Sequence, residues 1–248
     1  MSKDSENIIE IFSSIQGEGK YVGCRQVFVR FEGCNLHCAY CDTEHAIGAH
    51  PACRIETAAG SRMFHELLNP VSAEDAAVQI RALLVEAPTQ AVSFTGGEPL
   101  LHAPFIHTLR GKVDALTPFL LETNGTLSEP LATVLDDVDI ISMDLKLPSA
   151  TGEALWDAHR RFLTLARRKE LYVKMVIAEN TPDEEFIRAV SLLESVAPDA
   201  LLILQPVTPC GGVAACPPER VLAMQAEAMR HVRDARVIPQ THKFIGQL

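Results

Sequence analysis

The chain has 248 residues, of which 47% are hydrophobic, so we expect one large domain with a sizeable core. Its formal net charge of −10 argues against a nucleic-acid groove built on bulk positive charge. No apolar run approaches the roughly 18 residues of a membrane span, and the first residues lack the apolar core of a signal peptide. The seven cysteines, an odd number, do not indicate a disulfide framework, which favours a cytoplasmic location.

The first stretch of the chain contains a glycine-rich turn and a predicted strand. An apolar run at 8–12 leads into Gln16-Gly17-Glu18-Gly19, a flexible turn in which the backbone can approach a ligand. Residues 26–31 alternate with period two, which predicts a strand. Arg30 lies near the end of this strand. Its guanidinium can bind a substrate carboxylate or form a surface salt bridge, and the residues alone favour neither.

A cysteine-rich loop follows that strand directly. Cys34, Cys38 and Cys41 have the spacing C-x3-C-x2-C, and thiolates are ligands for iron–sulfur clusters and zinc. A [4Fe–4S] cluster needs four ligands and this loop supplies three, which leaves one iron open to a small molecule. Structural metal sites usually close their coordination shell, so the open iron indicates catalysis. The alternative is a zinc site with His37 or His45 as the fourth ligand.

The rest of the chain alternates between helices and strands after one irregular stretch. Residues 44–70 combine glycines, prolines and mixed polarity, and we expect a long loop or small insertion in which Cys53 has no role. Helices are then expected at 72–86, 104–113, 131–135, 153–168, 181–196 and 217–232, and strands at 91–94, 119–121, 138–143, 171–177, 201–204 and 236–238.

Two of these helices have recognisable starts. Ser72 to Asp75 resembles a capping box, and Pro182 occupies the expected first helical position after Thr181. Strands that alternate with helices predict a parallel sheet covered by helices. Six repeating units fit the chain better than eight. We therefore expect a single α/β domain over 1–248, folded as a partial (β/α)6 TIM-like barrel.

Polar side chains follow five of the predicted strands. Because ligands bind at the carboxyl ends of parallel strands, these clusters are expected to meet at one rim. They lie at 34–41, 95–98, 122–124, 144–146 and 205–208. In the second cluster, Gly96 and Gly97 let bare backbone approach a ligand, and their carbonyl groups can accept hydrogen bonds from an ammonium group.

The cysteine spacing with Tyr40 before the third cysteine, followed by Gly96-Gly97-Glu98-Pro99, resembles the radical S-adenosylmethionine superfamily. Within it, the chain is similar over nearly its whole length to the 7-carboxy-7-deazaguanine synthase family. The most specific matches are Gln16-Gly17-Glu18-Gly19 and Pro239-Gln240-Thr241-His242-Lys243. The resemblance implies that the open iron chelates S-adenosylmethionine and that the reduced cluster cleaves it to a 5′-deoxyadenosyl radical.

The implied reaction is a radical ring contraction. The radical would take a hydrogen atom from C6 of 6-carboxy-5,6,7,8-tetrahydropterin, and the ring would rearrange and lose ammonia to give 7-carboxy-7-deazaguanine. S-adenosylmethionine would be regenerated when the hydrogen returns. This chemistry needs a carboxylate clamp, for which Arg30 and a Mg²⁺ ion at Thr43 are suited. It also needs partners for a guanine-like edge, for which Gln16 and Glu18 are suited.

The resemblance assigns further roles residue by residue. The three cysteines would bind the cluster. Substrate would be bound by Ile15, Gln16, Gly17, Glu18, Arg30 and Thr95. S-adenosylmethionine would be bound by Tyr40, Cys41, Asp42, Gly97, Ser142, Asp144, Gln205, Pro206, Val207 and Thr208. The segment Ser142-Met143-Asp144-Leu145-Lys146 departs from the shorter Ser-Pro-Lys pattern of many members, which leaves the part of Lys146 open.

The resemblance also implies a homodimer and a flavodoxin-like or ferredoxin-like electron donor, with a small pterin as substrate. One rival is a glycyl-radical enzyme activating enzyme, which shares the cysteine loop and the Gly-Gly-Glu-Pro segment but acts on a partner protein. A second rival is a non-catalytic metal-binding protein on the same scaffold, against which the intact Gly96, Gly97, Glu98 and Arg30 argue. Cys210 and Cys216 are expected to lie in an ordinary loop.

Overall fold

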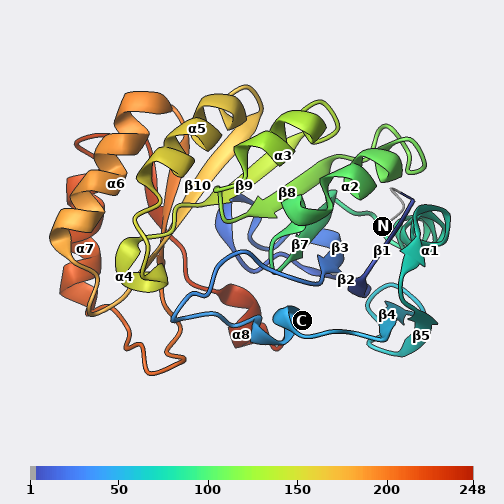
Figure 1. Ribbon diagram of the computed structural model, residues 1–248. Helices are drawn as coiled ribbons and strands as arrows, with labels where there is room; N and C mark the ends of the chain where they lie inside the picture. Colours follow the sequence, from blue (N-terminus) through green and yellow to red (C-terminus); the bar gives the residue numbers. More distant parts are fainter. Residues whose placement is uncertain (1–3, 248) are drawn as a thin grey trace.

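The computed structural model describes residues 4–247, which are organised around one ten-stranded sheet (Figure 1). The strand order is β12-β11-β10-β9-β8-β7-β3-β2-β4-β5. The bounds are β2 (Ile8–Ile15), β3 (Arg25–Phe31), β4 (Ala52–Glu56), β5 (Phe64–Leu68), β7 (Ala91–Gly96), β8 (Phe119–Thr123), β9 (Ile140–Asp144), β10 (Glu170–Ile177), β11 (Leu201–Pro206) and β12 (Ala235–Val237).

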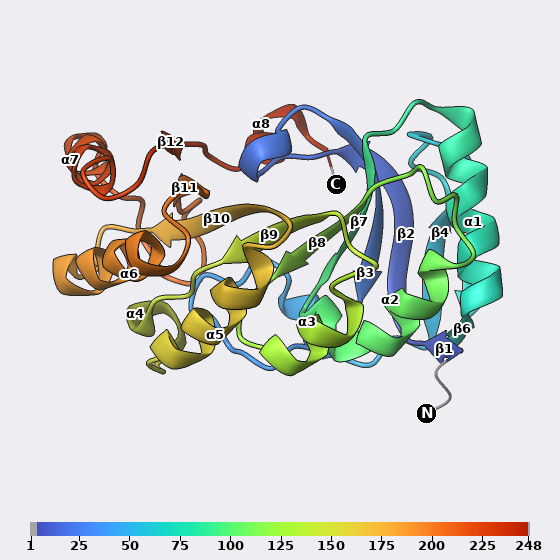
Figure 2. The same cartoon turned by 90° about the horizontal axis from the view of Figure 1, so that it is seen from above.

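Helices cover the convex side of this curved sheet (Figure 2). The helices are α1 (Ala73–Glu86), α2 (Ala103–Arg110), α3 (Ser128–Val134), α5 (Trp156–Ala166), α6 (Asp183–Val196) and α7 (Pro218–Ala228). Strands β3 and β7 to β12 run parallel. Each of β3, β7, β8, β9, β10 and β11 is followed by one of these helices, and β12 and β5 lie at opposite edges. The predicted open (β/α)6 barrel is confirmed.

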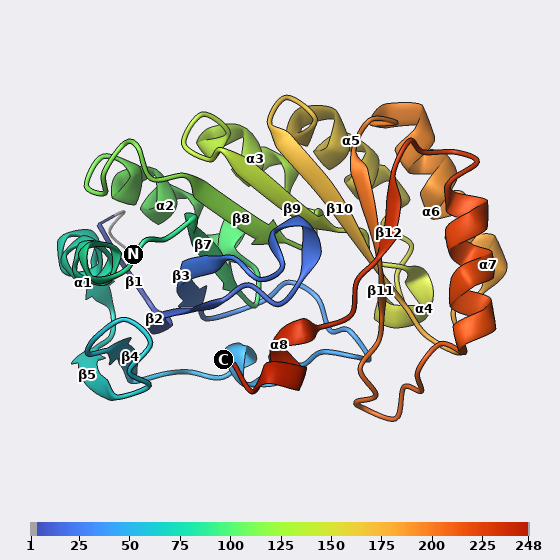
Figure 3. The ribbon, with the colours of Figure 1, turned by 180° about the vertical axis from the view of Figure 1, so that it is seen from behind.

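Shorter elements complete the chain. They are β1 (Ser5–Glu6), β6 (Val71–Ser72), α4 (Pro148–Thr151) and α8 (Thr241–Ile245), with the 3₁₀ turns η1 (Gly19–Tyr21), η2 (Glu44–Ile47) and η3 (Pro99–His102). Seen from behind, α8 lies on the concave side of the sheet (Figure 3). The Thr241 amide donates to the Gly17 carbonyl at 2.9 Å, which joins α8 to the glycine-rich turn. Among residues 4–247, every helix is too short or too polar to cross a bilayer.

The alternation of side chains along β3 explains how one strand serves both the core and the concave side. Val27, Val29 and Phe31 are fully buried in the hydrophobic core on the helix side of the sheet. Phe28 and Arg30 point to the other face and line a cavity there. Because successive side chains in a strand alternate between faces, the period-two pattern of 26–31 also places Arg30 in this cavity.

The structure overturns three expectations about local structure. The stretch at 44–70 is not irregular, since β4 and β5 form an antiparallel hairpin whose first strand pairs with β2. Cys53 and Ile55 alternate along β4 and are fully buried in the core. The first strand, β2, is antiparallel to β3, so the sheet is mixed rather than purely parallel. Finally, Pro182 is the N-cap of α6 and not its first helical residue.

The expected start of α1 is confirmed in its main feature. The Ser72 hydroxyl accepts a hydrogen bond from the Asp75 amide at 3.0 Å, which satisfies one of the free amides of the first turn. Thr181 does not cap α6 in this way. Its hydroxyl accepts a hydrogen bond from the Ala178 amide instead and closes the turn before the helix.

Candidate active site

A cavity of about 450 Å³ lies at the carboxyl ends of the parallel strands. This volume is typical of a small-molecule site. Nearly all of the sequence-predicted site residues line it: Ile15, Gln16, Gly17, Glu18, Arg30, Cys34, Cys38, Tyr40, Cys41, Asp42, Thr43, Thr95, Gly97, Asp144, Gln205, Val207 and Thr208. Two predicted residues do not, namely Ser142 and Pro206. Ser142 is buried one pleat below Asp144 on β9, paired in register with Glu122 and Tyr172.

The cysteine loop forms one wall of the cavity. Burial raises the pKa of the Cys34 and Cys38 thiols, so without a metal they stay protonated. A bound metal removes these protons, because only the thiolate is a strong ligand. His37, one of the two expected zinc ligands, is exposed and is not among the lining residues. The side chain of the other, His45, lies outside the described part of the chain.

Two further cysteines flank this wall without joining it. The Cys210 thiol donates to the Tyr40 carbonyl at 3.4 Å, which packs the loop after β11 against the cysteine loop. Cys216 is buried in the hydrophobic core. Both are free thiols, as are all seven cysteines of the chain.

Gly97 brings the loop after β7 into direct contact with the cysteine loop. A Cβ atom at this position would lie 1.9 Å from the Gly33 carbonyl oxygen and 2.9 Å from Cys34 Cβ. Only glycine fits such an approach. The Glu98 amide donates to the same Gly33 carbonyl at 2.8 Å. The two loops therefore form one rigid wall around the thiols.

Glu98 is fully buried behind this wall and ties it to the next strand. Its carboxylate accepts hydrogen bonds from the Thr123 hydroxyl and the Asn124 amide, both at 2.8 Å, and from the Leu100 amide at 3.0 Å. Burial raises the pKa of Glu98 to about 7, although these donors act in the opposite direction. One carboxylate thus fixes the ends of β7 and β8 relative to the cysteine loop.

A row of paired charges lines a second part of the cavity. Lys174 on β10 is paired with Glu18 at 2.5 Å and with Asp144 at 3.7 Å. Asp144 is also paired with Lys146 at 3.2 Å, and the Lys146 ammonium lies 5.4 Å from the centre of the Tyr40 ring. Burial lowers the pKa of both lysines, but the neighbouring carboxylates outweigh it and raise both pKa values. Both lysines are therefore charged at neutral pH.

The C-terminal segment extends this row. The Gln240 amide donates to Glu18 and to Asp42, in each case at 2.8 Å, and Lys243 pairs with Asp42 at 3.1 Å. Burial raises the pKa of Asp42, but the hydrogen bonds from Gln240 and Lys243 bring it down to about 2. The pKa of Glu18 is also lowered, because Lys174 and Gln240 outweigh its burial.

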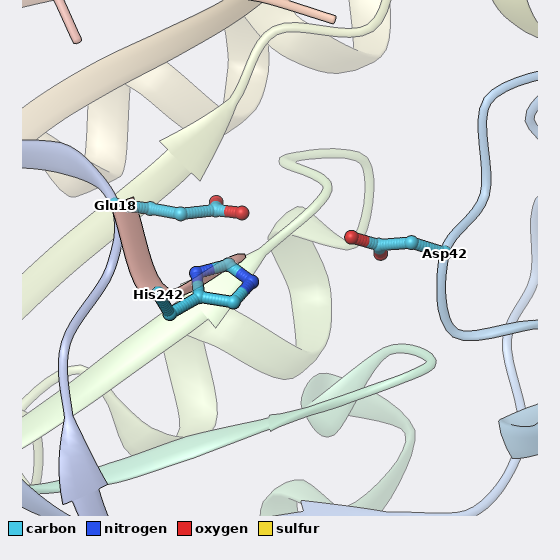
Figure 4. Close-up of side chains that lie close together, drawn as sticks. All are labelled: Glu18, Asp42 and His242. Atoms are coloured by element: carbon cyan, nitrogen blue, oxygen red, sulfur yellow. The ribbon is translucent and has the colours of Figure 1, made fainter. Parts of the chain in front are cut away.

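Glu18, Asp42 and His242 converge on a small space in this segment (Figure 4). One ligand-type atom from each lies within 4.8 Å of the others. Two carboxylates and an imidazole are possible metal ligands. However, the Gln240 amide already contacts both carboxylates. Lys174 also pairs with Glu18 and Lys243 with Asp42, so the cluster forms an ion-pair network without a metal.

Glu122 lies on the side of the cavity that holds Gln16 and Thr95, and no individual role was predicted for it. Its two carboxylate oxygens accept hydrogen bonds from Gln16 Nε2 at 2.6 Å and from Thr95 Oγ1 at 2.9 Å. Gln16 and Thr95 are both predicted substrate residues. The available signal was the place of Glu122 in a polar cluster at a strand end. Lys174 gave no comparable signal, because it lies within the apolar sequence of β10.

Arg30 lies at the cavity but forms an ion pair that differs from the surface salt bridge considered in the sequence. It lines the cavity, and its Nε donates to Glu10 Oε1 at 2.8 Å. Glu10 is buried, so this is a partly desolvated ion pair rather than a surface one.

Comparisons with known proteins agree with this arrangement. Residues 28–193 match the family model described as the radical SAM superfamily. The chain is 43% identical to 7-carboxy-7-deazaguanine synthase of Geobacter sulfurreducens, with 100% of each chain covered, and 36% identical to that of Archaeoglobus fulgidus, with 97% and 98% covered. Its fold is similar to the crystal structure of QueE from Escherichia coli, with a TM-score of 0.60, 20% identity and coverage of 96% and 95%.

Gly97→Ala is expected to prevent the cysteine loop from holding a cluster. The added methyl group collides with backbone at Gly33, which forces the two loops apart. Iron content and the cluster absorbance after anaerobic reconstitution measure the effect. Gly111→Ala is the matched control, because its Cβ would lie 3.9 Å from the nearest atom, a Thr108 carbonyl oxygen. A Gly97→Ala protein with the same iron content as Gly111→Ala would contradict the close approach.

Glu98 is expected to make the stability of the cluster-free protein depend on pH. Its pKa is raised from 4.5 to about 7, so the folded state binds the proton more tightly than the unfolded state. The stabilisation is complete below about pH 4.5 and is lost as the pH rises towards 7. Glu98→Gln removes this dependence. The difference in unfolding free energy between wild type and Glu98→Gln, from urea titrations, should fall by about 2–4 kcal/mol over this range. If the difference in unfolding free energy stays constant over this pH range, the raised pKa of Glu98 is wrong.

Proposed function

The chain belongs to the radical S-adenosylmethionine superfamily and, within it, to the 7-carboxy-7-deazaguanine synthase family, and we propose that it converts 6-carboxy-5,6,7,8-tetrahydropterin into 7-carboxy-7-deazaguanine. The reaction contracts the ring with loss of ammonia, as a step towards queuosine and other deazapurines. One observation carries the proposal. A single cavity joins three cluster-type cysteines to an arginine and to a carboxylate–amide pair suited to a pterin.

The residues on the cysteine side fit a [4Fe–4S] cluster with S-adenosylmethionine. Cys34, Cys38 and Cys41 are a three-thiolate donor set, and the bare backbone at Gly97 lies against them. Asp144 Oδ1 and Gln205 Oε1 are buried beside the cavity without a hydrogen-bond partner in the described part of the chain. Such acceptors suit the ammonium and hydroxyl groups of the cofactor. When bound, the cluster and S-adenosylmethionine supply one-electron reduction and hydrogen-atom abstraction at C6 of the pterin.

The residues on the other side fit the substrate. A pterin and a guanine share an edge with one ring N–H and one amino group, and a carboxylate such as Glu122 can accept from both. Gln16 holds Glu122 in place through its hydrogen bond, and Glu18 lies on the same turn. Arg30 supplies a guanidinium for the substrate carboxylate. These contacts orient the reacting carbon, and fixed orientation is a main source of rate enhancement.

Further expectations belong to the same proposal. Thr43 lines the cavity next to Asp42, and its hydroxyl would be a ligand for a Mg²⁺ ion that would balance the charge of the substrate carboxylate. A flavodoxin-like or ferredoxin-like donor supplies the electron, and the protein acts as a homodimer. The seven free thiols support a reducing, cytoplasmic compartment. The cavity of about 450 Å³ suits a small pterin and favours it over the partner protein of an activating enzyme.

The reconstituted protein is expected to turn over 6-carboxytetrahydropterin. Incubation without oxygen, with S-adenosylmethionine, Mg²⁺ and a reductant, should give a product lighter by one ammonia in the mass spectrum. Accumulation of 5′-deoxyadenosine and methionine without that product would keep the radical chemistry and reject the substrate. The activating-enzyme alternative would then be favoured, and a stable complex with a large partner enzyme would support it.

Arg30→Ala is expected to raise KM for the pterin by roughly 10- to 100-fold, because a charge-assisted hydrogen-bond pair contributes about 1.5–3 kcal/mol. Arg30→Lys keeps the charge but loses the planar guanidinium, so its KM should lie between those of wild type and Arg30→Ala. Steady-state turnover gives KM and kcat separately. Full turnover by Arg30→Ala with unchanged KM would remove the carboxylate clamp from the proposal.

A further inference from the structure

Four side chains from four neighbouring strands form one row across the sheet. Glu10 on β2 pairs in register with Arg30 on β3 and with Arg54 on β4, and Arg30 pairs with Thr95 on β7. Side chains at paired positions of neighbouring strands lie on the same face, within reach of one another. Three of these four residues carry charges, and two of them, Arg30 and Thr95, line the cavity. The row therefore continues from the cavity towards the edge of the sheet formed by β4 and β5.

A β-bulge sets the register of this row. Ile8 pairs with Phe31, whereas Glu10 pairs with Arg30, so β2 has one extra residue between these two pairs. Without that residue, an isoleucine would oppose Arg30 and Glu10 would point away from it. Ile8 and Ile9 are both buried, so the bulge does not release an apolar residue to solvent. Bulges are frequent beside active sites, where they redirect a side chain. Here the redirected side chain is a carboxylate.

The contact between Glu10 and Arg30 is close and selective. Arg30 Nε donates to Glu10 Oε1 at 2.8 Å, and the two side chains are 18% and 9% exposed. Arg54 lies 3.5 Å from the other oxygen, is 52% exposed and stacks on Phe64. The Arg30 guanidinium also lies 5.6 Å from the centre of the Phe12 ring. Arg30 is therefore closer to the Glu10 carboxylate and more buried than Arg54.

Within residues 4–247, this contact occupies Nε of Arg30 and leaves its two Nη groups without a hydrogen-bond partner. A guanidinium offers two edges for a carboxylate, and the bond from Nε to Glu10 uses one side of the group. We propose that Glu10 is a positioning residue that aims the remaining Nη groups of Arg30 at the substrate carboxylate. The role rests on the proposed function, because it assumes a carboxylate-bearing pterin in the cavity. Glu10 itself does not line the cavity.

Two variants separate the orientation of Arg30 from its charge. Glu10→Asp keeps the negative charge but shortens the side chain by one methylene, which breaks the contact with Nε. Glu10→Gln keeps the length and a carbonyl acceptor for Nε but removes the charge. If Glu10 acts by orientation, Glu10→Asp weakens binding of the substrate carboxylate and Glu10→Gln retains it. Arg54→Ala is the matched control, because it removes the other charged partner of Glu10 outside the cavity.

The test compares 6-carboxypterin with pterin, which differ only in the carboxylate and have no hydrogen at an sp³ C6 to react. Anaerobic calorimetric titration of the reconstituted holoenzyme with S-adenosylmethionine and Mg²⁺ gives Kd for each ligand. The ratio of the two values is the readout, because a general loss of structure weakens both ligands and leaves the ratio unchanged. Thermal unfolding verifies that each variant is folded.

We expect wild type, Glu10→Gln and Arg54→Ala to prefer 6-carboxypterin by similar factors, and Glu10→Asp to lose about tenfold of this preference. Arg30→Ala should lose at least as much. If Arg30→Ala loses the preference and folded Glu10→Asp keeps it, the clamp stands and the role of Glu10 is wrong. If wild type binds neither ligand, the proposed substrate is wrong and the role of Glu10 falls with it. If Glu10→Gln loses the preference and Glu10→Asp keeps it, the effect is one of charge, which also overturns the positioning role.

Discussion

The charges buried around the cavity must be paired, and this constraint organises the site. An unpaired charge in a desolvated position is strongly destabilising, so each of these side chains needs an opposite charge within reach. Lys174 meets this need for both Glu18 and Asp144. Those three residues come from the turn after β2, from β9 and from β10, so their pairing joins parts of the chain that are far apart in sequence. The rigidity of the wall follows from charge compensation as well as from apolar packing.

The two sides of the cavity are supported in different ways. On the cysteine side, backbone packs on backbone, because Gly97 allows two loops to touch and Glu98 holds both to β8. On the substrate side, side chains hold side chains. Glu122 is fixed by two hydrogen bonds, and Arg30 is fixed by Glu10. The first arrangement suits a cluster that has to be held in one place. The second presents oriented polar groups to a planar ligand.

The sequence predicted what depends on periodicity and on strand ends. The six strand–helix units and the meeting of five polar clusters at one rim follow from the rule that parallel strands share their carboxyl edge. It could not predict features set by long-range pairing. The hairpin of β4 and β5 was hidden because its strands have only five residues each and Phe64–Leu68 does not alternate polar with apolar residues. Lys174 could be recognised only from partners distant in sequence, and the position of Glu122 in a polar cluster did not reveal its contacts with Gln16 and Thr95. The cofactor role of Ser142, taken from a motif match, stays a prediction, since the residue is buried and does not line the cavity.

The contribution of Gln240 and Lys243 to the cavity wall has a consequence for biogenesis. Glu18 and the cysteine loop are synthesised early, but their bridging amide and the ammonium partner of Asp42 leave the ribosome only some 200 residues later. Until then, Asp42, which directly follows Cys41, lacks both its amide and its ammonium partner. The charge balance of this wall is therefore complete only after residues 240–243 have folded onto it.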